Sequence, residues 1–543
     1  MNRQIRAVSL LAGLMFLALM VNLTGSAMFR QASLNNDPHN VRVRDAEFSQ
    51  NRGNILVGSR PIATTTSSNG KFAYQRVYLS GPKYAPITGY YSYYYGRSML
   101  EQTQNAQLTG TSDAQWLSRI TGTLSGHKPE GGSITTTINA KAQDAAWDGL
   151  RGKKGAVVAL DYTTGAVLAM ASSPSYDPNE LASHHLNDTT RAWKNLVADP
   201  SSPLTNRATR EIYPPGSTFK LVTAAAALQN GYHPNSMVDS PENWILPGTR
   251  TPLTNDTTRA WKNLVADPSS PLSNRATREI YPPGSTFKLV TAAAALQNGY
   301  HPNSMVDSPE NWILPGTRTP LTNETNCGGS RITLAHALDI SCNTAFGKVG
   351  VSLGQDKIRD QAERFGFGKV VNSDVSSAAS RFPQNLTDAQ LAQSSIGQYD
   401  VAASPLQMAM VTAGIANGGK LMTPYLTAQV RASNLQVVSE HHPKQMSQPM
   451  TKESAEQLKA MMASVVNNGT GKRARINGTT VGGKTGTAQT VKGKAPYAWF
   501  VGWSDNPHVA VAVFIQSLDT AINEISGGRL AAPIARDVIE AMR

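Results

Sequence analysis

The chain has 543 residues, of which 40% are hydrophobic and 16% are charged, and its formal net charge is +13. This length exceeds one ordinary hydrophobic core and predicts two or three domains, while the composition excludes a wholly disordered chain. The positive charge is not gathered in a dense Lys/Arg block, so we do not expect a nucleic-acid partner. An anionic envelope or lipid surface explains the charge more simply.

The first residues carry an export signal. Residues 9–28 contain no charged side chain, and this is about the length of a helix that crosses a bilayer. Arg3 and Arg6 precede the run, so the positive-inside rule predicts a cytoplasmic tail at residues 1–8, a single transmembrane anchor at 9–28 and an extracytoplasmic body. The alternative is a cleavable signal peptide, because Gly25 and Ala27 are small enough for a cleavage site. Either interpretation exports the body.

Two modules follow the anchor. Residues 29–140 are rich in Asn, Ser, Thr, Gly and Tyr without a long helical period, and they predict a small β-rich N-terminal module. Residues 156–161 and 166–171 are apolar runs around a tight turn, which predicts a hairpin opening a larger domain at residues 150–543. Later in that domain we expect strands at 479–491, 498–504 and 508–516, and helices at 404–416, 452–466 and 529–543. This order predicts a mixed α/β fold in which helices cover a sheet.

A tandem repeat interrupts the domain. Residues 187–254 recur as 255–322, an offset of 68 residues, and the copies differ where Thr205 becomes Ser273. Solenoid repeats of this length drift in sequence and occur in three or more copies. A recent duplication, or an assembly error in the sequence, therefore explains the pair better than a repeat architecture.

Each copy contains Ser-x-x-Lys at the start of an Ala/Leu-rich helix, as Ser217 with Lys220 and as Ser285 with Lys288. Residues three apart on a helix share one face, so the amine can reach the hydroxyl. A serine hydroxyl is a poor nucleophile until a neighbouring base takes its proton, and a desolvated lysine can serve as that base. Alone, the motif is more often a solvated helix start.

Two further motifs change this interpretation. Ser341-Cys342-Asn343 stands 56 residues after Ser285, and Lys484-Thr485-Gly486-Thr487 falls on the first of the three late strands. Separately they are compatible with a helix cap, an Asn in a turn and a glycine at a strand end. Together and in this order, the three motifs are the signature of penicillin-binding proteins and class A β-lactamases, with Cys342 where the β-lactamase form has Asp.

The chain resembles class B penicillin-binding proteins over most of its length. Residues 52–55, Arg-Gly-Asn-Ile, resemble the entry motif of class B penicillin-binding proteins. Residues 81–90 resemble the pedestal segment of the actinobacterial penicillin-binding protein A group. Residues 396–398 and 404–409 resemble parts of the family's transpeptidase domain. The resemblance implies an antiparallel sheet covered by helices, a pedestal or dimerisation-like module at 29–140, and a serine D,D-transpeptidase of peptidoglycan that binds and is inhibited by penicillin.

The resemblance also implies roles for the motif residues. The serine attacks the penultimate D-Ala of a stem peptide, with oxyanion donors from its own N–H and from that of Thr487. Lys484 and Thr485 bind the terminal carboxylate, Ser341 relays a proton to the leaving amine, and Asn343 holds the peptide amide. No metal or organic cofactor is needed. The implied partners are peptidoglycan stem peptides, β-lactam inhibitors, the membrane and a glycosyltransferase of the cell-wall machinery.

Several choices stay open at the level of sequence. The sequence separation between the upstream hairpin and Ser217 resembles that of the family, which favours Ser217 as the nucleophile. The second copy runs without interruption into Ser341, which favours Ser285. Cys327 and Cys342 form a candidate disulfide in an exported chain, against the alternative of two buried free thiols. Other possible functions are a D,D-carboxypeptidase, a β-lactamase and an inactive scaffold of a cell-wall synthesis complex. A class A β-lactamase would need a general-base Glu in an omega loop, and we find no convincing equivalent in this sequence.

Overall fold

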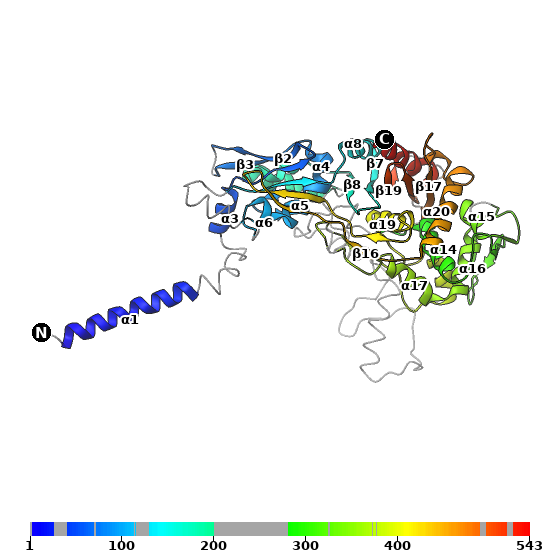
Figure 1. The fold of residues 1–543 in the computed structure, drawn as a ribbon, viewed down its shortest axis with the longest axis horizontal. Helices are drawn as coiled ribbons and strands as arrows, with labels where there is room; N and C mark the ends of the chain where they lie inside the picture. Colours follow the sequence, from blue (N-terminus) through cyan, green and yellow to red (C-terminus); the bar gives the residue numbers. More distant parts are fainter. Residues whose placement is uncertain are drawn as a thin grey trace, which may run out of the picture.

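The computed structural model describes residues 3–25, 41–69, 72–112, 115, 130–199, 203, 281–323, 326–371, 373–375, 377–488, 496–518 and 525–543. These residues form a long N-terminal helix, a smaller module built on a six-stranded sheet, and a larger domain built on a five-stranded sheet (Figure 1). The mixed α/β fold with a β-rich module before the large domain is therefore confirmed.

Helix α1, Arg3–Gly25, is the segment suited to a membrane. Its apolar part, Ala7–Gly25, has a mean hydropathy of 2.1 and is not buried against the rest of the protein. Among the described residues, it is the one helix that is long and apolar enough to cross a bilayer. It begins earlier than the predicted anchor at 9–28. The last three residues of that predicted anchor lie outside the described ranges.

The N-terminal module is built on strands in the order β15, β14, β6, β1, β2, β3. Neighbouring strands are antiparallel except β1 and β6, which are parallel. The strand bounds are β1 Ile55–Val57, β2 Arg60–Ser67, β3 Tyr74–Tyr78, β6 Ser133–Thr136, β14 Thr427–Arg431 and β15 Val437–Glu440. The module also contains the short helices and strands α3 Val41–Phe48, α4 Gly81–Thr88, β4 Tyr91–Ser92, β5 Gly96–Arg97, α5 Met99–Thr103 and α6 Asn105–Leu108.

Two strands of this sheet come from the second half of the chain. β14 pairs with β6, with Val430 opposite Ile134, and β15 forms the outer edge beside β14 (Figure 1). The predicted division into 29–140 and 150–543 therefore does not coincide with the sheet, because the hairpin at 427–440 belongs to the module. A shared hydrogen-bonded sheet, in addition to the chain itself, joins the module to the large domain.

Buried charges hold the module together. The carboxylate of Glu101, which is fully buried, accepts from Arg52 Nε at 2.6 Å and from Arg76 Nε at 2.7 Å. The hydroxyl of Tyr78 donates to the same carboxylate at 3.1 Å, and Arg76 also donates to the carbonyl of Gly53 at 2.7 Å. Burial alone would raise the pKa of Glu101, but the two guanidinium groups outweigh it and hold that pKa below its ordinary value. The Arg-Gly-Asn-Ile segment is thus anchored by a residue 49 positions away.

The large domain is built on the antiparallel sheet β17-β18-β19-β7-β8. The hairpin predicted at its start is β7 Lys153–Leu160 with β8 Val167–Ser173, and the three late strands are β17 Val481–Ala488, β18 Tyr497–Asp505 and β19 His508–Leu518. Alternate residues of a strand face opposite sides of its sheet. Accordingly, Ala156 and Val158 join one buried cluster, whereas Val157 and Ala159 join another. Both faces of the sheet are therefore covered.

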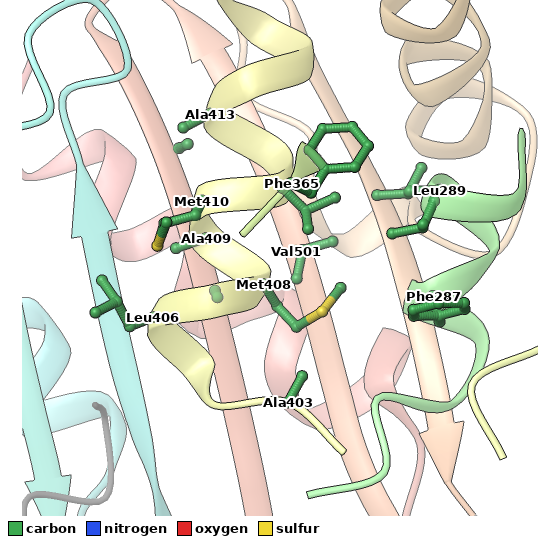
Figure 2. Packing of buried hydrophobic residues seen from close by; sticks show 14 of the residues in the cluster. Phe287, Leu289, Phe365, Ala403, Leu406, Met408, Ala409, Met410, Ala413 and Val501 are labelled. Carbon is green, nitrogen blue, oxygen red and sulfur yellow. The ribbon is translucent and has the colours of Figure 1, made fainter. Parts of the chain in front are cut away.

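Helices cover the two faces. α8 Ala140–Gly149 and α21 Ala532–Glu540 lie on one face, and α19 Pro405–Ala416 with α20 Lys452–Asn467 lies on the other. Figure 2 shows α19 against the sheet, with Met408 and Val501 in one apolar cluster beside Phe287 and Leu289. The predicted helices at 404–416 and 452–466 are present, with Ser404 and Thr451 as N-caps. The helix predicted at 529–543 is shorter, because the π-helical turn η7 Gly527–Ala531 precedes α21.

The remaining helices and strands of the described residues include the central helix α14. They are α9 Pro178–Ala182, α10 Leu186–Ala198, η4 Gly284–Phe287, α14 Lys288–Gln297, β9 Met305–Asp307, β10 Asn311–Ile313, β11 Pro320–Thr322, β12 Arg331–Thr333, α15 Leu334–Asp339, α16 Asn343–Leu353, α17 Gln355–Arg364, α18 Asp388–Ser394, β13 Leu421–Met422, β16 Gln445–Ser447 and η5 Lys472–Ala474.

The described structure uses parts of both repeat copies. Helix α10 comes from the first copy, and its Trp193 stacks on Tyr95 with ring centroids 4.0 Å apart. The described residues 281–322, which include η4 and α14, belong to the second copy. Ser217 and Lys220 lie outside the described residues.

We predict that Glu101→Gln lowers the free energy of unfolding by about 3–5 kcal/mol, because it leaves two guanidinium groups buried without their counter-charge. The stabilisation by Glu101 is present above the ordinary pKa of a glutamate and is lost as the pH falls through the lowered pKa of the folded state. Urea unfolding should therefore show a large difference from the wild type at pH 7 and a smaller one in acid. Asp148→Asn is the matched control, because its ion pair with Arg151 is exposed. An equal effect of both substitutions would contradict the prediction.

Candidate active site

The second Ser-x-x-Lys motif lies at the junction of η4 and α14. Ser285 is 9% exposed and Lys288 is fully buried. Helix α14 is buried along nearly its whole length, because its Ala/Leu-rich sequence offers apolar side chains on every face. The motif is therefore not a solvated helix start but part of the central helix of the domain.

The turn before Ser285 fits closely against a neighbouring loop. Gly284 N donates to the carbonyl of Gly397 at 2.9 Å, and a Cβ on Gly397 would lie 2.1 Å from the Gly284 oxygen. Gly397 also has a φ of +75°, which favours glycine. The Ile-Gly-Gln segment singled out in the sequence thus supports the turn that carries the serine.

Lys288 and Lys484 converge on the hydroxyl of Ser341. Lys288 Nζ lies 3.2 Å from Ser341 Oγ, and Lys484 Nζ lies 2.8 Å from the same oxygen. Lys288 also donates to Ser341 O and to Asn343 Oδ1, both at 2.7 Å. A hydroxyl oxygen has two lone pairs and one proton. The Ser341 hydroxyl therefore lies within proton-transfer distance of both lysine amines.

Strand β17 brings the Lys-Thr-Gly-Thr motif against the turn of Ser285. A Cβ on Gly486 would lie 2.9 Å from Thr286 Cγ2 and 3.1 Å from Pro283 O, so this close approach requires glycine. Trp499 on β18 fixes the same turn by donating from Nε1 to Pro282 O at 3.0 Å. Among the described strands, β17 pairs on one side with β18 and forms an edge of the sheet, where backbone N–H groups are open to a ligand.

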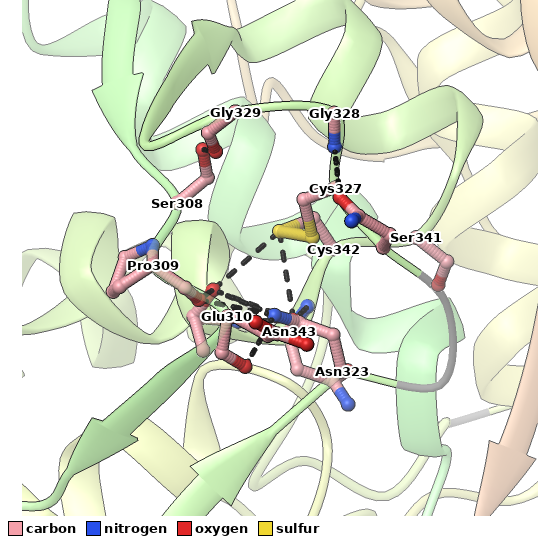
Figure 3. Close-up of a disulfide and its surroundings, with 12 residues drawn as sticks. Ser308, Pro309, Glu310, Asn323, Cys327, Gly328, Gly329, Ser341, Cys342 and Asn343 are labelled. Atoms are coloured by element: carbon pink, nitrogen blue, oxygen red, sulfur yellow. Dashed lines mark hydrogen bonds between the residues drawn. A yellow bond between two sulfur atoms is a disulfide. The ribbon is translucent and has the colours of Figure 1, made fainter.

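The Ser-Cys-Asn motif is held by a residue that the sequence analysis missed. Asn323 Oδ1 accepts from the backbone N–H groups of Asn343 at 2.8 Å and of Thr344 at 3.0 Å, and it thereby caps α16 (Figure 3). Cys342, the N-cap residue, forms a disulfide with Cys327, with the two Cα atoms 5.8 Å apart. A lone Asn 18 positions before the motif gives no local sign of this role.

Asp339 is a second residue that the sequence analysis did not single out. Its Oδ2 accepts from Ser464 Oγ at 3.0 Å, and its Oδ1 is buried without a hydrogen-bond partner among the described residues. Burial raises the pKa of Asp339 above its ordinary value, although the bond from Ser464 and the nearby charges of His336 and Lys484 lower it. An acidic side chain therefore lies in the electrostatic field of Lys484.

The described residues thus bring together one Ser-x-x-Lys, the Ser-x-Asn and the Lys-Thr-Gly-Thr motif, as the sequence proposed. Ser217 and Lys220 take no part in this description because they lie outside the described ranges. Within those ranges, no group of three His, Cys, Asp or Glu side chains is placed to hold a metal ion. The chemistry that this arrangement can perform is acyl transfer through an activated serine.

Comparison with protein families gives two matches. The penicillin-binding protein transpeptidase domain matches residues 155–264 and 253–540, and the penicillin-binding protein A dimerisation domain matches residues 52–134. The two transpeptidase matches overlap, and each contains one Ser-x-x-Lys copy.

Comparison with curated proteins and solved structures gives relatives along the whole chain. The peptidoglycan D,D-transpeptidase PbpA of Mycolicibacterium smegmatis is 34% identical over 552 aligned positions, which cover 100% of this chain and 99% of that protein. PbpA of Mycobacterium tuberculosis is also 34% identical, with the same coverage. A ceftriaxone acyl-enzyme structure of penicillin-binding protein A from M. tuberculosis superposes with a TM-score of 0.75 at 32% identity, covering 92% of this chain and 99% of that one.

We predict that loss of the disulfide destabilises the site. The bond closes a loop of 15 residues, for which the chain-entropy model gives roughly 3 kcal/mol. Cys327→Ser/Cys342→Ser should unfold at a lower urea concentration and acylate with penicillin more slowly, because Cys342 lies between Ser341 and Asn343. Wild-type protein reduced with dithiothreitol is the control and should behave like the variant. Two reactive thiols in unreduced, denatured wild-type protein would contradict the prediction.

Proposed function

The chain belongs to the penicillin-binding proteins, in the penicillin-binding protein A group of class B peptidoglycan D,D-transpeptidases, and from this membership we propose that Ser285 is the residue that is acylated. The observation that carries the proposal is the convergence of Lys288 and Lys484 on Ser341 Oγ beside the turn of Ser285. The donor substrate is a peptidoglycan stem peptide ending in D-Ala-D-Ala.

The first half-reaction forms the acyl-enzyme. Ser285 Oγ attacks the carbonyl carbon of the penultimate D-Ala while Lys288 Nζ takes the hydroxyl proton. Lys288 is fully buried and follows Ser285 by about one helical turn, so its amine is the proposed base. The tetrahedral intermediate then collapses, the peptide bond breaks, and Ser341 delivers a proton to the departing amine of the terminal D-Ala. Lys288, 3.2 Å from Ser341 Oγ, returns the proton to Ser341.

The second half-reaction forms the cross-link. An amine from a neighbouring stem peptide attacks the ester carbonyl of the acyl-enzyme, and the ester bond to Ser285 breaks as the new amide forms. The amine proton returns to Ser285 Oγ through the same lysine and serine pair. A site that binds the acceptor amine and excludes water favours cross-linking over hydrolysis of the ester. This preference distinguishes a transpeptidase from a carboxypeptidase or a β-lactamase.

Backbone and side-chain donors stabilise the charges that form. The N–H groups of Ser285 and Thr487 are the proposed oxyanion donors, because β17 runs directly against η4 at Gly486. Lys484 supplies a cation and Thr485 a hydroxyl for the terminal carboxylate of the substrate. Asn343, which accepts from Lys288 through Oδ1, is proposed to hold the peptide amide.

The choice of Ser285 over Ser217 rests on continuity of the chain. The described residues 281–323 lead from the serine turn through α14 to Asn323, which caps the helix of the Ser-x-Asn motif. One domain has room for one such helix against β17 and Ser341. We therefore expect the spare motif to lack the oxyanion donors, each of which contributes roughly 2.7–4 kcal/mol to the transition state.

We predict that Ser285→Ala abolishes labelling by a fluorescent penicillin, while Ser217→Ala, the matched control in the duplicate, leaves labelling intact. Peptide mapping of the labelled wild type with a protease that cleaves before aspartate should place the label on the peptide of the second copy. That peptide spans both the labelled serine and Ser273, which distinguishes it from the first copy with Thr205. The reverse pattern would assign the reaction to Ser217. Retained labelling in both single variants would mean that the two copies exchange places.

We further propose that α1 anchors the protein in the cytoplasmic membrane with its body outside. The apolar helix and the preceding Arg3 and Arg6 support this single-pass topology. The disulfide Cys327–Cys342 also fits an oxidising location outside the cytoplasm. Because cross-linking acts on glycan strands, a membrane glycosyltransferase of the cell-wall machinery is the proposed partner. The acyl-enzyme of the M. tuberculosis relative with ceftriaxone supports β-lactams as inhibitors of this chain.

We predict that a protease added to intact spheroplasts digests the body of the protein and leaves a short membrane-bound fragment that contains α1. The control is a cytoplasmic protein of the same cells, which should stay intact until the membrane is permeabilised with detergent. Protection of the body in intact spheroplasts would contradict the proposed topology.

A further inference from the structure

A hydroxyl group outside the three motifs contacts the Lys-Thr-Gly-Thr strand. Thr470 lies in the turn between α20 and η5, and its Oγ1 is 2.7 Å from Thr485 Oγ1. Thr485 is 8% exposed, whereas Thr470 is exposed. Thr470 therefore forms a hydrogen bond with the hydroxyl that is proposed to bind the substrate carboxylate.

The turn of Thr470 is fixed against the helix that precedes Ser341. The N–H of Thr470 donates to the carbonyl of Asp339 at 3.2 Å. A Cβ on Gly469 would lie 2.2 Å from the same oxygen, so the turn could not carry a larger residue there without moving. On its other side, a Cβ on Gly528 would lie 2.6 Å from the Thr470 carbonyl oxygen. The backbone of Thr470 is thus held from two directions, and its hydroxyl has a defined place.

The two hydroxyls share one hydrogen bond, and this limits what each can donate. A hydroxyl has a single proton. If Thr485 donated to Thr470, its proton would not be available to the carboxylate. If Thr470 donates to Thr485, the Thr485 proton is available, and the bond that it accepts strengthens it as a donor.

We propose that Thr470 is a positioning residue for the terminal carboxylate of the substrate: it donates to Thr485 Oγ1 and thereby directs the Thr485 proton to the carboxylate. The inference rests on the proposed role of Thr485. It also connects carboxylate recognition with the proton relay, because the turn that carries Thr470 is bound to Asp339, two residues before Ser341.

The test compares two probes on the full-length protein in detergent. Benzylpenicillin carries the carboxylate, and its methyl ester does not. Thr470→Val keeps the shape and removes the hydroxyl, so Thr485 keeps its proton but loses the bond that orients it. The second-order rate of acylation by benzylpenicillin should then fall about fivefold, as for the loss of one neutral hydrogen bond. The rate with the methyl ester should stay within about twofold of the wild type, and Thr470→Ser should restore the rate with the acid.

A double-mutant cycle shows whether Thr470 acts through Thr485. Thr470→Val/Thr485→Val should react with benzylpenicillin at the same rate as Thr485→Val alone, because the proton that Thr470 directs is already absent. Thr317→Val is the control for removal of an exposed turn hydroxyl outside the three motifs, because Thr317 Oγ1 donates to the Leu314 carbonyl at 3.0 Å. It should leave both rates unchanged.

Three outcomes would overturn the inference. They are an unchanged rate of Thr470→Val with the acid, an equal fall with acid and ester, and additive effects in the cycle. If Thr470→Val does not fold, as judged by its melting temperature, Thr470→Ala is measured against the same criteria. A wild-type protein that neither probe acylates would instead overturn the proposed function, and the inference with it.

Discussion

The approach of two buried lysine side chains to one serine oxygen is the constraint on which the site depends. Two amines can share one hydroxyl oxygen only if each is held in place. The fold must therefore hold both lysines from rigid elements, Lys288 from the buried helix α14 and Lys484 from β17. Ser341 itself has a φ of +63°, an unfavourable conformation for a non-glycine residue. The proposed roles of Lys484 toward the substrate carboxylate and of Lys288 toward the serine proton both depend on these fixed positions.

The N-terminal module also buries two basic side chains close together, and it pairs them with a carboxylate. Arg52 and Arg76 are buried near each other, but Glu101 lies between them and supplies the counter-charge. A buried cluster of this kind, with its charges paired, is a structural device. The shared sheet of β6 and β14 then connects the module rigidly to the domain that carries the site.

The sequence predicted those helices and strands whose signals lie within a few neighbouring residues. The hairpin β7–β8, the three late strands and helices α19 and α20 each have their periodicity and caps within a few residues. The sequence motifs that bring Lys288, Ser341 and Lys484 together were recognisable for the same reason. Glu101, Asn323 and Thr470 were not, because each acts through partners 15 or more positions away. The membership of β14 and β15 in the N-terminal sheet was missed because strand pairing at long range leaves no periodic signal.

The duplication shows how little a local motif determines by itself. Residues 217–220 and 285–288 have the same sequence, so any difference in their reactivity must come from the surrounding chain. Trp193 of the first copy packs on Tyr95, and Asn323 follows the second copy directly and caps α16. Both ends of the repeated region are thus fixed to the fold, and the extra period falls between them. Closing a loop that is longer by one period adds little entropy cost, because the cost grows only with the logarithm of loop length. The duplication is therefore compatible with an intact site, provided that a serine turn remains in contact with β17.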